Sequence, residues 1–244
     1  MLALPTMQAK PNDAFQTLAT AAPGCVLQLP DDLDAATRAY LLANVEALTE
    51  PLRPWGRFRQ PVRIQTVADP AALHAQLTQP SRTELRAVAA LDSVVLWPPE
   101  APEELRVLLL HELAHVQCFQ RCTPPHGRVP YLPTWFREGL ALYVAHGRPE
   151  PQARRALAKH PDLPQLPNAD DAQIARDPAA AYALAAHLFT AWHDRFGTVG
   201  LTGLYAAMRQ GHPFATAFQR ACHQRLAEFI ELWLAALRRE ARTS

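Results

Sequence analysis

The pentapeptide His111-Glu112-Leu113-Ala114-His115 constrains this chain more than any other feature. Its two histidines are four residues apart, and on an α-helix such residues lie on one face, one turn apart. Both imidazoles can then reach a single metal ion, and zinc is the metal that such a site favours. Glu112 leaves the helix at a different angle and points beside the metal. A general base must lie there to take a proton from the attacking water.

The alternative is a surface helix that carries two histidines by chance, which is expected in roughly a few per cent of chains of this length. The flanking residues favour a buried helix that begins after Pro98, Pro99 and Pro102 and ends near Arg121. Its apolar run Val107–Leu110 is typical of a helix inside a domain. Two histidines and a glutamate on such a helix need a compensating partner, which a metal ion supplies.

A second helix is predicted from Thr134 to His146, with Thr134 as its N-cap after Pro133. A catalytic zinc ion usually has three protein ligands and a water molecule, so the two histidines need one more ligand. Glu138, in the first turns of this helix, is the predicted third ligand, and Gly139 beside it permits close helix approach. The alternative is that Glu138 is an ordinary solvated glutamate.

Together, the H-E-L-x-H segment and the later run Leu132-Pro133-Thr134-Trp135-Phe136-Arg137-Glu138-Gly139-Leu140-Ala141-Leu142-Tyr143 resemble the gluzincin metallopeptidases, specifically the peptidase MA-like family. The resemblance implies one zinc ion, held by His111, His115 and Glu138, with Glu112 as catalytic base. A three-histidine zincin pattern does not fit, because Arg121 occupies the place of the third histidine.

Further roles follow only from the resemblance. An Ala-Tyr element of these relatives matches Ala181-Tyr182, so Tyr182 is the predicted donor to the oxyanion, with His187 as the second choice. The alternative for Tyr182 is a core tyrosine with its hydroxyl at the surface. The thermolysin branch has an aspartate where this chain has Leu142, so the partner that would orient a ligand histidine is not identified.

The pattern predicts an α+β fold: a zincin-like N-terminal lobe with a small mixed sheet and the active-site helix, followed by an all-helical C-terminal lobe. The segment Val94-Val95-Leu96 is either a core strand or the sheet edge that binds a peptide by strand addition. The predicted strands are 25–29, 62–67, 86–91 and 93–97, and the predicted helices before the motif are 31–48, capped by Asp31 or Asp32, and 69–77.

After Gly147 the sequence favours helices, with a Pro- and Asp-rich loop at 161–171. Glycines at 197, 200, 203 and 211 are expected to interrupt the helical region. We interpret residues 1–244 as one catalytic domain with approximate lobes 20–148 and 149–244. The predicted helices of the second lobe are 150–160, 177–196 and 224–239.

Composition is that of a soluble enzyme. The net charge of +1 gives no reason to expect a nucleic acid or an anionic membrane as partner, and no apolar run approaches a membrane span. The N-terminus lacks the features of a signal peptide, which favours the cytoplasm, or export if a leader has been removed. The four cysteines, Cys25, Cys118, Cys122 and Cys222, lack the spacing of a zinc knuckle. Cys118 and Cys122 are expected to be single buried thiols, and the alternative is a second metal or redox pair. His126 and His146 could face the cleft, and the alternative is that they are loop or surface residues.

The predicted function is hydrolysis of peptide bonds in a peptide or protein substrate by Glu-assisted attack of water at zinc. Two alternatives keep the zinc site: a zincin-fold binding or regulatory protein without peptidase activity, and a zinc hydrolase of a non-peptide amide. Fold alone does not separate the three. The sequence specifies neither the substrate nor the oligomeric state.

Overall fold

The computed structural model describes residues 15–19, 25–30, 33–67, 69–75, 86–99, 101–148, 155 and 177–243. The chain divides into two compact units, Met1–Gln120 and Arg121–Ser244. The first unit contains the β-sheet, and the described part of the second unit is helical apart from its connecting segments.

The first unit is organised around a five-stranded mixed sheet with the strand order β1-β2-β3-β5-β4. Strands β2, β3 and β5 run parallel, while β1 and β4 pair antiparallel with their neighbours and form the two edges. Parallel neighbours require crossover connections, which the helices of this unit provide. The strands are β1 (Phe15–Ala19), β2 (Cys25–Pro30), β3 (Val62–Thr66), β4 (Ala87–Ala89) and β5 (Ser93–Leu96).

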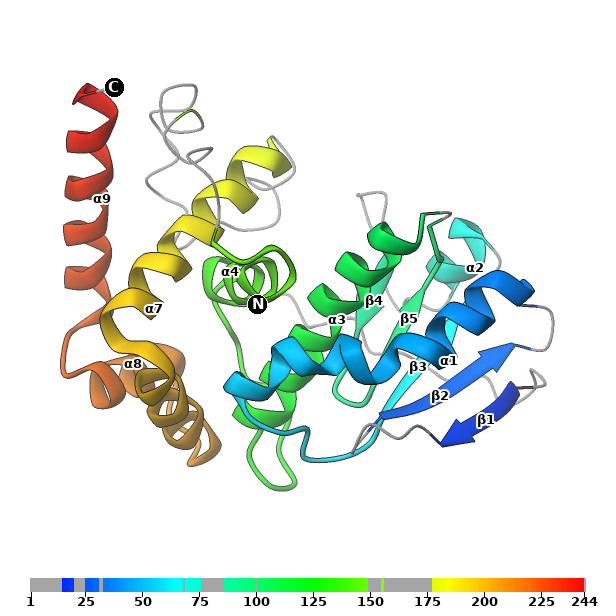
Figure 1. Cartoon of the computed structure of the whole chain (residues 1–244). Helices are drawn as coiled ribbons and strands as arrows, with labels where there is room; N and C mark the ends of the chain where they lie inside the picture. Colours follow the sequence, from blue (N-terminus) through cyan, green and yellow to red (C-terminus); the bar gives the residue numbers. More distant parts are fainter. Residues whose placement is uncertain are drawn as a thin grey trace. The chain divides into compact units, whose positions relative to one another are not determined.

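In its described residues the first unit also contains three α-helices and one 3₁₀-helix. Helix α1 (Ala35–Thr49) continues into the 3₁₀-helix η1 (Glu50–Trp55), and together they connect β2 to β3. Helix α2 (Pro70–Ala75) follows β3, and α3 (Pro102–Cys122) follows β5. Figure 1 shows α1 and α3 in front of the strands.

The N-cap of α1 is Asp34, and the prediction of Asp31 or Asp32 was wrong. Oδ1 of Asp34 accepts a hydrogen bond from the backbone N–H of Thr37 at 2.8 Å. This is the bond from an N-cap side chain to the third helical residue that satisfies an otherwise unpaired amide. The hydrogen bond from Thr37 holds the pKa of Asp34 below its usual value.

The central strands and α3 form the apolar core of the first unit. Val62, Ile64, Val94, Val95 and Leu96 are buried in β3 and β5, as are the leucines of α3 at positions 105, 109, 110 and 113. Full burial of one such side chain contributes about 1.5–3 kcal/mol to folding. Alternation predicted β3 correctly, whereas the predicted strand 86–91 is limited to the three residues of β4.

The described part of the second unit contains α4 (Thr134–His146), α7 (Pro178–Arg209), α8 (Phe214–Cys222) and α9 (Leu226–Thr243). The predicted bounds of α4 are correct, but Thr134 is its first helical residue and Pro133 occupies the N-cap position. Helix α8 was not predicted as a separate helix.

Aromatic rings fill the space between the helices of the second unit. The ring of Phe136 in α4 lies 5.6 Å from that of Trp192 in α7 and 5.0 Å from that of Phe214 in α8, between centroids. Phe218 of α8 contacts Phe229 of α9 at 5.6 Å. Edge-to-face and tilted pairs of this kind add to the energy of burial. The C-terminal helices therefore form an apolar core.

Helix α7 bends at Gly197, whose φ of 60° and ψ of −162° are not helical. The predicted end of this helix at residue 196 coincides with the bend. Gly200 and Gly203, which were also expected to interrupt the region, lie inside the helix that follows. A glycine adopts positive φ without steric cost, so only Gly197 and Gly211 supply the expected breaks.

The prediction of an α+β protein is confirmed at the level of a mostly helical chain with a small mixed sheet. The division into lobes at residue 148 stays a prediction. The predicted loop 161–171, and the predicted helix 150–160 apart from Arg155, lie outside the described residues.

Candidate metal centre

Helix α3 presents the two motif histidines side by side. It begins at Pro102, and Glu103 and Glu104 occupy its first turn, where negative charge is favourable. The Nε2 atoms of His111 and His115 are 3.1 Å apart, and the rings meet edge to face with centroids 4.7 Å apart. The ring of His115 also stacks on Phe119 at 5.9 Å. The helix thus brings both imidazoles to one point.

Glu138 is held by the packing of α4 against α7. Its neighbour Gly139 faces Ala185 and Phe189 of α7 so closely that an added Cβ atom would lie 2.6 Å from the Cβ of Phe189. Glu138 is itself buried, and its Oε1 accepts a hydrogen bond from Nε of Arg137 at 3.0 Å. A carboxylate has two oxygens with several lone pairs, so the ion pair with Arg137 is compatible with metal coordination by Glu138.

His111, His115 and Glu138 form a group that could hold a metal ion, since one ligand atom of each lies within 4.8 Å of the others. Metal–nitrogen bonds of about 2.0–2.1 Å at a tetrahedral angle place two nitrogens about 3.3 Å apart, close to the observed 3.1 Å between the histidines. Two imidazoles and one carboxylate are a donor set that zinc accepts. The residues therefore fit a metal, and their geometry alone does not choose its identity.

Burial adds a second reason for a cation. The exposed fraction is 8% for Glu112, 7% for His115 and 8% for Glu138. Transfer of an ionised carboxylate out of water is costly unless the charge is paired. Glu112 follows His111 directly on α3 and lies in the turn between the two histidines. A divalent ion held by the group would offset part of the cost of both carboxylates.

The sequence did not predict the partner of Glu138 or the residues that support α3. Arg137 precedes Glu138 directly, and a neighbouring Arg-Glu pair on a helix carries no signal that the two side chains meet. Phe119 is four residues after His115, and this helical spacing was the one signal in the sequence that its ring would contact the ring of His115.

The two predicted catalytic residues of α7, Tyr182 and His187, are not members of the metal group. Tyr182 is 38% exposed. Nδ1 of His187 accepts a hydrogen bond from Nε1 of Trp233 in α9 at 2.9 Å, so the neutral ring carries its proton on Nε2. The role of each in catalysis stays a prediction. His126 and His146 are exposed.

Of the two alternatives for Val94-Val95-Leu96, the core strand is correct and the sheet edge is not. These residues belong to β5, which pairs with β3 on one side and with β4 on the other. Among the described strands, β4 pairs with β5 alone, so the edge is Ala87–Ala89. Adjacent apolar strands connected by a tight turn give no local signal of which one is outermost.

The prediction of single buried thiols is confirmed for Cys118 and Cys122, and Cys222 is also a buried thiol. The side chain of Cys25 lies outside the described residues. Burial raises the pKa of Cys222, against a hydrogen bond from Trp192 that lowers it. Burial and the raised pKa both disfavour the thiolate that reacts or binds metal.

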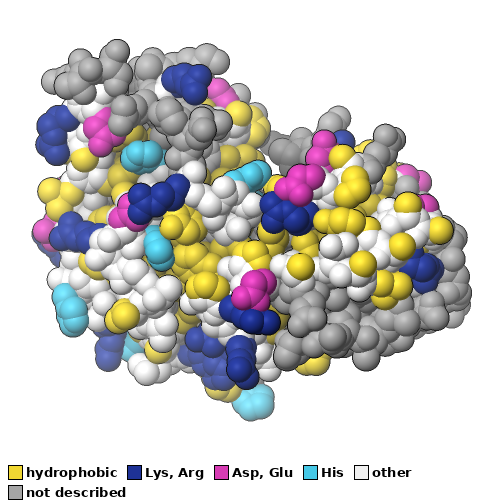
Figure 2. Space-filling view, in the orientation of Figure 1, with side chains coloured by type: hydrophobic (Ala, Val, Ile, Leu, Met, Phe, Trp, Pro, Cys, Tyr) yellow, Lys and Arg dark blue, Asp and Glu magenta, His cyan; other side chains and the backbone are white. Residues whose placement is uncertain are grey.

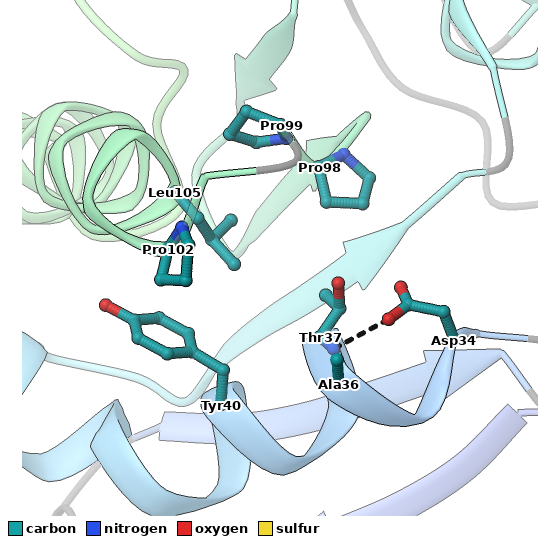
Figure 3. Close-up of a pocket in the computed structure, with 8 residues that line it drawn as sticks. All are labelled: Asp34, Ala36, Thr37, Tyr40, Pro98, Pro99, Pro102 and Leu105. Atoms are coloured by element: carbon teal, nitrogen blue, oxygen red, sulfur yellow. Dashed lines mark hydrogen bonds between the residues drawn. The ribbon is translucent and has the colours of Figure 1, made fainter.

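A separate pocket of about 320 Å³ lies between α1 and the start of α3. Figure 3 shows Tyr40 and Thr37 of α1 opposite the prolines that precede and begin α3. Its one carboxylate, Asp34, already caps α1. Burial, together with the charge of Glu103, raises the pKa of Tyr40. The lining is Asp34, Ala36, Thr37, Tyr40, Pro98, Pro99, Pro102 and Leu105, a set without the histidines and paired carboxylates of the metal group.

Charged side chains of both signs are dispersed over the face shown in Figure 2. In the part of the chain that the structure describes, no helix combines the length and the apolar character needed to cross a membrane. No protein-family model matches this sequence, and no match is found among curated proteins.

Proposed function

We propose that this protein is a zinc-dependent metallopeptidase of the gluzincin type, which cleaves peptide bonds with Glu112 as general base. The observation that carries the proposal is the convergence of His111, His115 and Glu138, with Glu112 on the same helix as the two histidines. The donor set favours zinc, and the spacing of the motif residues favours hydrolysis.

In this proposal His111, His115 and Glu138 hold the ion, and Arg137 keeps the carboxylate of Glu138 in place. When bound, zinc supplies a Lewis acid that polarises a carbonyl group and lowers the pKa of water. Glu112 takes the proton of the attacking water and returns it to the nitrogen of the departing amine.

The choice of a peptide as the substrate rests on the resemblance of the sequence to the gluzincin metallopeptidases. Among the described strands, β4 pairs on one side only, and its residues Ala87 and Val88 are buried.

The test compares the wild type with Glu112→Gln. Both proteins are purified without chelator, analysed for zinc and incubated with a mixed peptide library. The matched control is Glu104→Gln, which changes an exposed glutamate in the first turn of the same helix. We expect one zinc ion in all three proteins, with cleavage reduced about 10²- to 10⁴-fold in Glu112→Gln only.

If the protein binds zinc but shows no peptide cleavage that is lost in Glu112→Gln, the proposal of a peptidase is refuted. A zinc-holding regulatory protein or a hydrolase of a non-peptide amide would then remain. Absence of stoichiometric metal from the wild type would refute the metal site itself.

A further inference from the structure

Two buried glutamines of α3, Gln117 and Gln120, form hydrogen bonds with the backbone of the segment that follows α1. Nε2 of Gln117 donates to the carbonyl oxygens of Leu52 at 3.1 Å and Gly56 at 2.8 Å. Gln117 is 2% exposed and belongs to α3, two residues after His115. The amide therefore connects the active-site helix to η1 and to the turn that ends it.

Gln120 makes a more extensive set of contacts. Its Oε1 accepts from the backbone N–H groups of Arg59 at 2.7 Å and Gln60 at 3.2 Å. Its Nε2 donates to the carbonyl oxygens of Gln60 at 3.2 Å and Leu91 at 3.0 Å. One side chain thus satisfies backbone groups of two segments, the approach to β3 and the turn between β4 and β5.

The two glutamines lie on the side of α3 opposite the histidines. At about 100° per residue, Gln120 is rotated by roughly 180° from His111, and Gln117 by roughly 240°. Their neighbours on this helix are mostly apolar, and apolar contacts are not directional, so they permit small rolls and slides. Hydrogen bonds from a side chain to fixed backbone groups are directional and do not permit them.

We propose that Gln117 and Gln120 are positioning residues for the metal centre, whose amides fix the roll and the axial register of α3 and thereby the position from which its two histidines bind the ion. This inference rests on the metal site of the proposed function. A slide of one residue moves a helix by about 1.5 Å and turns it by about 100°. Metal ligands must be held to within about 0.5 Å and 10–20°, so even a small part of that movement impairs the site.

The experiment measures metal binding in Gln120→Met and Gln117→Met. Methionine has nearly the length of glutamine but provides none of these hydrogen bonds. Zinc affinity is measured by competition with a chromophoric chelator, and the geometry of the site by the visible absorption of the Co²⁺-substituted protein. The control is Leu73→Ala, which removes a fully buried side chain from α2 and so weakens the first unit without altering the glutamine contacts. Thermal unfolding of each metal-free protein measures its stability.

We expect zinc affinity to fall about tenfold or more in Gln120→Met, and less in Gln117→Met, which loses fewer hydrogen bonds. The Co²⁺ spectrum should shift in both glutamine variants and stay unchanged in Leu73→Ala, even where Leu73→Ala is the less stable protein. Should Gln120→Met fail to fold, Gln117→Met provides the same comparison.

Wild-type affinity and an unchanged spectrum in the glutamine variants would overturn the inference alone, with the metal site intact. An equal loss of zinc affinity in Leu73→Ala would also overturn the inference, because the loss would then be explained by the lower stability of the first unit. A wild type that binds neither zinc nor Co²⁺ would overturn the proposed function, and this inference with it.

Discussion

A side chain larger than hydrogen has no room at Gly139. A Cβ atom there would lie 2.6 Å from the Cβ of Phe189 and closer still to the carbonyl oxygen of Ala185. Carbon atoms in contact are normally about 3.5 Å apart, so the substitution Gly139→Ala lacks about 0.9 Å of space. The oxygen of Ala185 is part of the backbone of α7 and cannot rotate away. The two helices must therefore separate.

The expected cost follows from two opposing effects. Overpacking typically destabilises a protein by about 1–3 kcal/mol, and a clash with helix backbone favours the upper end. Replacement of glycine by alanine inside a helix returns up to about 1 kcal/mol. The net loss is about 2 kcal/mol, which lowers the midpoint of thermal unfolding by roughly 4–8 °C for a protein of this size.

Circular dichroism during heating measures this midpoint, and Gly203→Ala is the matched control. A Cβ atom at Gly203 would lie 3.2 Å from the Cβ of Ala221, a contact that is tight but about 0.6 Å longer than the one at Gly139. We expect its midpoint to be unchanged or raised. Because Glu138 adjoins Gly139, the Gly139→Ala protein should also bind zinc more weakly. A Gly139→Ala protein as stable as the wild type would refute the argument from close packing.

Three further predictions concern the metal and the helical unit. Removal of zinc by a chelator should lower the unfolding temperature measured by calorimetry. The loss of stability should be about 4 kcal/mol relative to a sample whose free zinc concentration is 1,000-fold above the dissociation constant. The same treatment should have a much smaller effect on Glu138→Gln. Burial, with a smaller contribution from Arg148, lowers the pKa of His193 below its usual 6.5, while Asp194 opposes the shift. The contribution of His193 to stability is then present above pH 6.5 and lost as the pH falls below it, so His193→Gln should flatten the fall in urea midpoint between about pH 7 and about pH 5. Trp233→Phe removes the hydrogen bond to His187 and should cost about 0.5–1.5 kcal/mol in chemical denaturation, whereas no loss would show that this bond contributes nothing to stability.

The sequence by itself determined the features that depend on residues close along the chain. The spacing of His111 and His115 places both imidazoles on one helical face, and the bounds of α3 and α4 follow from prolines, a terminal glycine and apolar periodicity. The bend at Gly197 is local in the same way, because a positive φ is a property of the residue itself. The sequence did not predict the N-cap of α1 correctly, because several aspartates precede this helix and only Asp34 accepts the hydrogen bond from the backbone N–H of Thr37.

The tertiary structure decided everything that depends on partners distant in the sequence. That β4 rather than β5 forms the edge of the sheet depends on hydrogen bonds between strands, which leave no trace in either segment. The contacts of Gln120 reach about sixty residues back along the chain, and those of Gly139 nearly fifty residues forward. Such contacts form only when the chain closes long loops, so helical periodicity predicts the face that carries a residue but not the segment that it meets.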